Sequence, residues 1–114
     1  MLNILIADDH ALIRKGLVEL LRGARVPAVV GEATTGQEAL TMSRAQAWDV
    51  IILDISMPDG SGVQTLARLK REQPQRPVIM HSMHDNAVVV RRCLALGASG
   101  YVLKESAAEE LLGA

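Results

Sequence analysis

The chain has 114 residues, enough for one compact domain, and 49% of them are apolar, enough to build a core. Twelve basic residues stand against 13 acidic ones, and this balance argues against the clustered positive charge of a nucleic-acid surface. Cys93 is the only cysteine, so no disulfide framework or zinc cluster is expected. Because no apolar run approaches about 18 residues and no signal-peptide pattern is present, we expect a cytoplasmic protein without membrane contact.

Short apolar runs recur along the chain and are typical of strands buried on both faces. They lie at Leu2–Ala7, Ala28–Val30, Val50–Leu53, Val78–Met80 and Tyr101–Leu103. Amphipathic segments separate them, at about Ala11–Leu21, Gly36–Arg44, Val63–Lys70, Ala87–Leu96 and Ala107–Leu112. Five strands alternating with five helices predict an α/β fold, a doubly wound parallel sheet with right-handed crossovers and helices on both faces.

The expected helices carry signals at their ends and on their faces. Thr35–Glu38 and Ser106–Glu109 both read as capping boxes, and Gly97 stands where a helix would stop. The last helix would reach the end of the chain at Ala114 soon after its cap, so we expect a shortened fifth helix. Apolar side chains of the first helix share one face at 3.6-residue spacing: Ile13, Leu17, Leu20 and Leu21.

In sheets of this kind, ligands bind beyond the carboxyl ends of the strands. The groups that follow four of the strands are Asp8 with Asp9, Asp54, Ser82 and Lys104. Three carboxylates against one lysine leave two negative charges unmatched, a costly arrangement unless a proton or a cation enters. Magnesium fits such a site because it binds through one or two carboxylates, waters and phosphate oxygens. The pattern predicts a phosphoryl-transfer site in which Asp54 attacks in line, with Mg²⁺ or Mn²⁺ as the cofactor.

Four stretches at these spacings resemble the receiver domain of response regulators, and the likeness covers essentially the whole chain. They are Ile6–His10, Ile52–Gly62, His81–His84 and Gly97–Lys104. The resemblance implies a CheY-like, flavodoxin-like sheet with strand order 2-1-3-4-5, so that residues 1–114 form one receiver domain. Glu105 stands where many receivers have proline, as in the NarL/FixJ subfamily.

The resemblance also implies roles for the residues of the acidic site. Asp54 would accept a phosphoryl group from a sensor histidine kinase. Asp9 would bind the metal directly and Asp8 through water, and the backbone carbonyl of Ser56 would complete the protein ligands. The domain would catalyse its own phosphorylation and dephosphorylation rather than act as an enzyme on external substrates.

A switch and an output follow from the same resemblance. Lys104 would contact the phosphoryl group, Ser82 would bond to it, and Tyr101 would follow the movement. The fourth helix, fifth strand and fifth helix would form a homodimer surface. NarL/FixJ members usually carry a C-terminal LuxR-type helix-turn-helix, which is absent from this sequence, so DNA binding and transcriptional regulation would belong to a parent protein.

Three other functions were weighed. An aspartyl-phosphate phosphatase would have a second Asp two residues after the nucleophile, where this chain has Ser56. A flavodoxin-like nucleotide binder would want a phosphate loop after the first strand, where Asp8 and Asp9 would repel a phosphate. A pseudo-receiver that only binds partners would lack part of the residue set, which is complete here.

Several residues also have a purely structural interpretation. Asp8 or Asp9 alone could cap the first helix. Cys93 is expected to be a small core residue and Tyr101 could simply pack. Surface or loop positions are expected for the three histidines because they lack ligand spacing: His10, His81 and His84. The pair Arg91 and Arg92 is expected on a solvated helix face.

Overall fold

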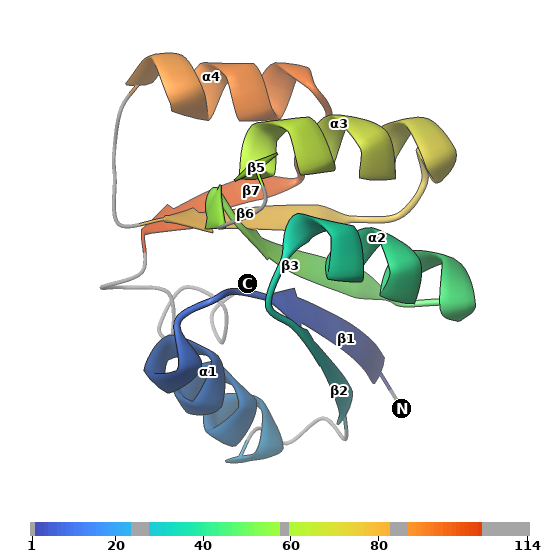
Figure 1. Cartoon of the computed structure of the whole chain (residues 1–114), viewed down its shortest axis with the longest axis vertical. Helices are drawn as coiled ribbons and strands as arrows, with labels where there is room; N and C mark the ends of the chain where they lie inside the picture. The colour runs from blue at the N-terminus through green and yellow to red at the C-terminus, as the bar shows by residue number, and fades with distance from the viewer. Residues whose placement is uncertain (1, 24–27, 58–59, 83–86, 104–114) are drawn as a thin grey trace.

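The structure is a computed structural model that describes residues 2–23, 28–57, 60–82 and 87–103. Within these ranges, five parallel strands form a sheet in the order β2-β1-β3-β6-β7 (Figure 1). They are β1 (Leu2–Ala7), β2 (Ala28–Ala33), β3 (Val50–Asp54), β6 (Val78–Ser82) and β7 (Gly100–Leu103). In chain order this is 2-1-3-4-5, so the predicted doubly wound α/β fold is confirmed.

Helices cover both faces of this sheet. They are α1 (Ala11–Gly23), α2 (Gly36–Ala45), α3 (Gly62–Glu72) and α4 (Ala87–Ala95). Helix α1 lies against one face, and the other three helices lie against the opposite face (Figure 1). The predicted fifth helix, residues 107–112, lies outside the described residues.

Some strand boundaries differ from the predictions. Strands β2 and β6 continue to Ala33 and Ser82, because pairing with their neighbours persists after the apolar pattern stops. A short antiparallel pair, β4 (Ser56–Met57) and β5 (Gly60–Ser61), follows β3. Two-residue strands are too short to show an alternating pattern, so the sequence did not predict them.

The core is divided between the two faces because successive side chains of a strand point to opposite sides. On β1, Leu5 joins the larger apolar cluster under α2, α3 and α4, whereas Ile4 and Ile6 join the smaller cluster under α1. The expected buried face of α1 is shifted: Leu20 is 36% exposed, and Val18 is buried. The helix therefore contacts the sheet along a line that lies to one side of the predicted stripe.

The helix ends follow the predicted chemistry with small differences. The Thr35 Oγ1 accepts a hydrogen bond from the Glu38 backbone N–H at 3.0 Å, as in a capping box. The Glu38 carboxylate accepts from the Thr34 N–H at 3.0 Å, one residue earlier than that motif prescribes. Gly97, with φ +106°, follows the end of α4, where its left-handed backbone turns the chain.

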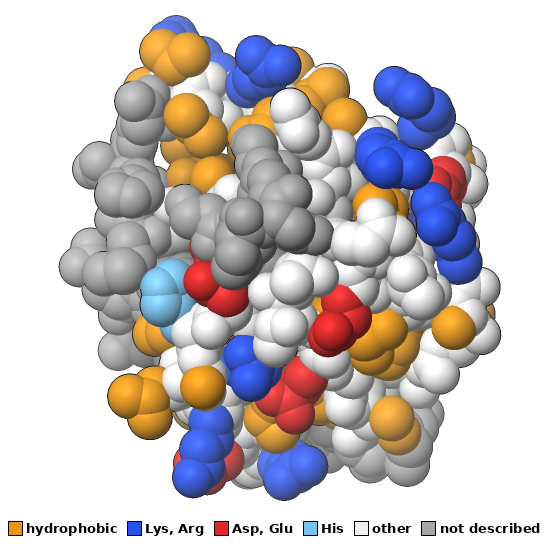
Figure 2. Space-filling view, viewed as in Figure 1, with side chains coloured by type: hydrophobic (Ala, Val, Ile, Leu, Met, Phe, Trp, Pro, Cys, Tyr) orange, Lys and Arg blue, Asp and Glu red, His pale blue; other side chains and the backbone are white. Residues whose placement is uncertain are grey.

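Other single-residue predictions concern the surface and the core. Cys93 is buried in the larger cluster, where burial raises the pKa of its thiol, so its expected role as a small core residue is confirmed. Arg91 and Arg92 are exposed as expected. In the view of Figure 2, acidic and basic side chains are both spread over the surface. None of the helices in the described ranges combines the length and the apolar character needed to span a bilayer.

Gly62 packs against the backbone at the end of β3, and substitution of this glycine tests how tight the packing is. A Cβ atom there would lie 2.3 Å from the Asp54 carbonyl oxygen and 2.6 Å from the Ile55 Cα, and backbone cannot rotate away. We expect Gly62→Ala to lower the free energy of unfolding by about 2 kcal/mol. The control is Gly16→Ala in α1, where an added Cβ meets nothing within 4 Å; this change should raise it by about 0.5–1 kcal/mol. Urea unfolding followed by Trp48 fluorescence measures both, and equal effects would contradict the packing argument.

Candidate functional site

The parallel register brings the carboxyl ends of β1, β3 and β6 to one edge of the sheet. Ala7 on β1 pairs with Leu53 on β3, so Asp8 and Asp54 each come one step further along adjacent strands. Asp54 in turn pairs with His81 on β6. The strands therefore bring Asp8 and Asp54 together although they lie 46 positions apart in the sequence.

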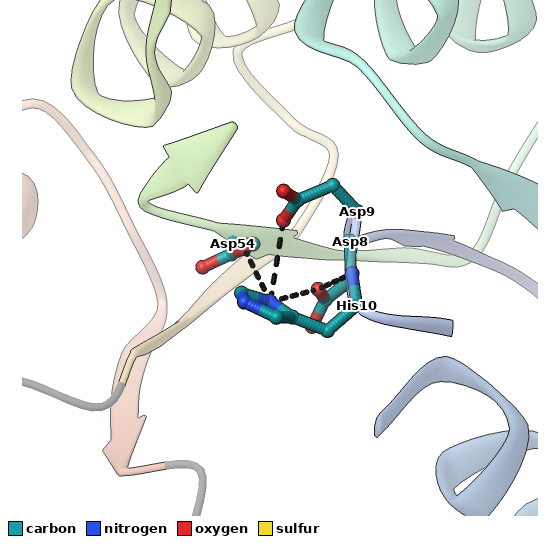
Figure 3. Close-up of side chains that lie close together, drawn as sticks. All are labelled: Asp8, Asp9, His10 and Asp54. Carbon is teal, nitrogen blue, oxygen red and sulfur yellow. Dashed lines mark hydrogen bonds and ion pairs between the residues drawn. The ribbon is translucent and has the colours of Figure 1, made fainter. Parts of the chain in front are cut away.

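Four side chains converge at this edge (Figure 3). Nδ1 of His10 lies 3.0 Å from Oδ1 of Asp8, 3.2 Å from Oδ1 of Asp9 and 3.7 Å from Oδ2 of Asp54. One potential ligand atom from each of the four residues lies within 4.8 Å of the others. Asp8 and Asp54 are almost fully buried, whereas the side chains of Asp9 and His10 are 30% and 49% exposed. The site thus has a buried acidic floor and a partly exposed rim.

The segment between β1 and α1 is held by its own hydrogen bonds. Oδ1 of Asp8 accepts from the backbone N–H of His10 at 2.7 Å, a turn typical of Asp. Arg14 donates to the Asp8 carbonyl at 2.7 Å and to the Glu32 carboxylate on β2 at 3.0 Å. Because the Asp8 carboxylate bonds the residue before α1 rather than the helix's first turn, simple capping does not describe its position.

The expectation of a surface or loop position is confirmed for His10, which is exposed in the loop between β1 and α1, and is wrong for His81. His81 lies on β6 and is 1% exposed, with Nε2 3.4 Å from Oδ2 of Asp8. His10 is partly exposed, but its ring faces the three carboxylates. The contact of His81 with Asp8 joins strand ends that are far apart in the sequence, so no local spacing of ligands indicates it. His84 lies outside the described residues.

One sequence signal could have identified the two histidines. His10 directly follows the acidic pair, and His81 interrupts the apolar run of β6 immediately before Ser82. A polar residue in a strand covered on both faces needs a partner, because burying an unpaired polar group is costly. The partner of His81 had to come from a neighbouring strand end.

Of the remaining predicted site residues, the structure describes all but one. Ser82 is buried at the carboxyl end of β6, and its backbone pairs with Leu103 on β7. Tyr101, on β7, is partly buried and packs against the larger core cluster. Ser56 lies in β4, two residues after Asp54. Lys104 lies outside the described residues, so its predicted contact with the acidic site stays a prediction.

The donor set suits a divalent cation. Three carboxylates carry more negative charge than the neighbouring imidazoles can offset, and crowded like charges favour binding of a cation. Carboxylate oxygens are the preferred ligands of Mg²⁺, Ca²⁺ and Mn²⁺. The residues that could hold the ion are Asp8, Asp9 and Asp54, with His10 beside them.

Comparison with known proteins supports a common fold and family. The response regulator UvrY of Escherichia coli is 34% identical over 114 residues, which cover 100% of this chain and 52% of that protein. The "Probable transcriptional regulatory protein NarL" of Mycobacterium tuberculosis is 36% identical over 112 residues, covering 98% of this chain and 52% of that protein. The solved receiver domain of NarL from that organism superposes with a TM-score of 0.90 at 35% identity, over 98% of this chain and 90% of that one.

Another similar solved structure contains a modified aspartate and a bound metal ion. A response regulator protein from Burkholderia pseudomallei contains a phosphorylated aspartic acid, a calcium ion and citrate. It superposes with a TM-score of 0.87 at 25% identity, over 100% of this chain and 66% of that chain. This chain spans about half the length of the curated relatives it matches. Residues 4–114 match the model of the response regulator receiver domain, and the chain belongs to that family.

Proposed function

We propose that this receiver domain accepts a phosphoryl group on Asp54 in a reaction that requires a divalent cation. The observation that carries the proposal is the position of Asp54, a buried carboxylate at the end of the central strand β3 beside Asp8 and Asp9. The phosphoryl donor is proposed to be the phosphohistidine of a sensor histidine kinase. The phosphorylated aspartate and calcium ion of the Burkholderia relative support this chemistry by similarity.

The transfer balances as a substitution at phosphorus. A carboxylate oxygen of Asp54 forms the new O–P bond, and the P–N bond to the donor histidine breaks, with its electron pair remaining on the imidazole nitrogen. The cation, when bound, offsets charge on the phosphoryl oxygens. Water later attacks the phosphorus, the O–P bond to Asp54 breaks, inorganic phosphate leaves and the carboxylate is restored.

Each residue of the site then has a proposed task. Asp9 holds the cation directly and Asp8 acts through a water, with the backbone carbonyl of Ser56 as a third protein ligand. Lys104 contacts the phosphoryl oxygens, and Ser82 donates a hydrogen bond to one of them. The neighbouring position of Ser82, at the end of the strand next to β3, supports that role.

The domain that responds to phosphorylation is proposed to lie in another part of a longer protein. The relative NarL is named as a transcriptional regulatory protein, and this chain matches only half of its length. A DNA-binding domain elsewhere in a longer protein would then read the phosphorylated state. A homodimer formed through α4, β7 and the residues that follow them is proposed as the intermediate step, and the exposure of Val88 and Leu94 on α4 supports it.

The rival functions fit the site less well. A phosphatase acting on external substrates would need an acid–base carboxylate at the position of Ser56. A partner-binding pseudo-receiver would not need three carboxylates gathered at one edge, where their repulsion costs stability.

Asp54 is expected to be the only residue that takes up a stable phosphoryl group. Incubation with a cation and acetyl phosphate should add one phosphoryl mass to the wild-type chain and none to Asp54→Asn. The control is Asp49→Asn, since Asp49 is an exposed residue just before the opposite end of β3, and it should behave as wild type. Intact mass spectrometry measures the adduct, and its persistence in Asp54→Asn would refute the assignment.

Repulsion among the three carboxylates should lower the free energy of unfolding of the metal-free protein. In buffer containing a chelator, Asp54→Asn should raise the free energy of unfolding by about 1 kcal/mol, because it removes one of three like charges that share the site. Glu19→Gln on the exposed surface of α1 is the control and should change it by less than about 0.5 kcal/mol. Urea unfolding gives both values. A less stable Asp54→Asn protein would mean that the neighbouring histidines already neutralise the cluster.

Ser82 is expected to transmit phosphorylation rather than to permit it. Ser82→Ala should still bind the phosphoryl mimic beryllofluoride, because Asp54 and the acidic pair are unchanged. It should lose the change in amide hydrogen exchange around Tyr101 that the mimic causes in wild type. Hydrogen exchange with and without the mimic tests this, and equal responses in the two proteins would leave Ser82 with a structural role.

A further inference from the structure

His10 occupies the centre of the acidic site, although the charge argument for a cation does not require it there. Its Nδ1 is a near neighbour of all three carboxylates, at 3.0, 3.2 and 3.7 Å from Asp8, Asp9 and Asp54 (Figure 3). The three carboxylates come from the end of β1, from the residue after it and from the end of β3. A single ring nitrogen therefore faces the point that the carboxylates share.

The backbone holds the ring in this place. The N–H of His10 donates to Oδ1 of Asp8 at 2.7 Å, and its carbonyl accepts from the N–H of Arg14 at 3.0 Å in the first turn of α1. Both backbone groups of the residue are hydrogen-bonded, so little backbone freedom remains to be lost when the ring binds an ion. A histidine with a mobile backbone would lose backbone conformational entropy on binding, which would weaken the binding.

The spacing of the four groups matches one ion. Ligand atoms on opposite sides of a small divalent ion are separated by about 4.2 Å, twice a typical bond of about 2.1 Å. The carboxylate oxygens and the imidazole nitrogen all lie within 4.8 Å of one another. Small side-chain movements would place an ion between them, and the 49% exposure of His10 leaves that side open to water.

We propose that His10 supplies an imidazole nitrogen to the cation of this site, so that the receiver binds transition-metal ions in preference to Mg²⁺. This inference rests on the proposed cation-dependent function and names the class of ion that serves it. Imidazole is a good ligand for Co²⁺, Ni²⁺ and Zn²⁺, whereas Mg²⁺ takes oxygen ligands and keeps much of its water. A site with three carboxylates alone would show a smaller preference.

A second arrangement uses the same atoms. Without a metal ion, the His10 ring hydrogen-bonds to Asp8 at 3.0 Å, and in this arrangement a metal ion would have to displace the ring. The two arrangements predict opposite effects of removing the ring: loss of a ligand weakens metal binding, whereas loss of a competitor strengthens it.

The test measures binding of Mg²⁺ and Co²⁺ alone by calorimetry, at a pH of about 8 where free imidazole is neutral. The proteins are the wild type, His10→Ala and His10→Asn. We expect the ratio of the Co²⁺ to the Mg²⁺ association constant to fall by about tenfold or more in both variants, because a nitrogen ligand is lost. Thermal unfolding confirms that each variant is folded.

A spectroscopic measurement identifies the nitrogen directly. Mn²⁺ bound to the wild type should show ¹⁴N coupling in electron spin echo experiments, and the coupling should vanish in His10→Ala. The control is His81→Leu, which removes the other imidazole near Asp8 and should retain the coupling. Absence of coupling in the wild type, its loss only in His81→Leu, an unchanged ratio of association constants, or tighter metal binding by His10→Ala would each overturn the proposal.

The two proposals can fail separately. If the wild type takes up a phosphoryl group on Asp54 but shows no nitrogen coupling, the role of His10 is refuted and the receiver function stands. If nitrogen coupling is present but no phosphoryl group is taken up with any cation, the domain is a metal-binding pseudo-receiver.

Discussion

The alignment of β1 with β3 is the constraint on which the rest of the site depends. In a parallel sheet, neighbouring strands end at the same edge, so the residues after Ala7 and Leu53 must lie side by side. This places the carboxylates of Asp8 and Asp54 together where both are buried. Helices on both faces keep water from the strands that carry them, so these charges have only the rim of the site through which to meet a cation.

Burying like charges opposes folding, and the site is arranged to limit that cost. A hydrogen bond from the His10 backbone reaches Asp8, and the rings of His10 and His81 lie on two sides of the same carboxylate. Such contacts reduce repulsion without removing it, which leaves the site able to gain stability from a bound cation.

The packing around Asp54 joins this residue to neighbouring elements of the fold. Its carbonyl oxygen would be 2.3 Å from a Cβ on Gly62 at the start of α3, and the next residue, Ile55, accepts a hydrogen bond from the Gly62 N–H at 2.6 Å. The N–H of Ile55 donates to the His81 carbonyl on β6 at 3.3 Å. Asp54 is thus linked through the backbone to both α3 and β6, and β6 ends at Ser82.

The sequence by itself determined the fold class, because apolar runs, capping residues and glycines act locally and each specifies its own element. The strand order and the acidic edge were predictable too, from the resemblance carried by Asp8, Asp9, Asp54 and their neighbours, and the structure places those three together. Only the tertiary structure decided the burial of His81 and the orientation of the His10 ring. The contacts of His81 with Asp8 and of His10 with Asp54 join residues distant in sequence, and they depend on strand register and on ring orientation, neither of which leaves a periodic signal in the chain.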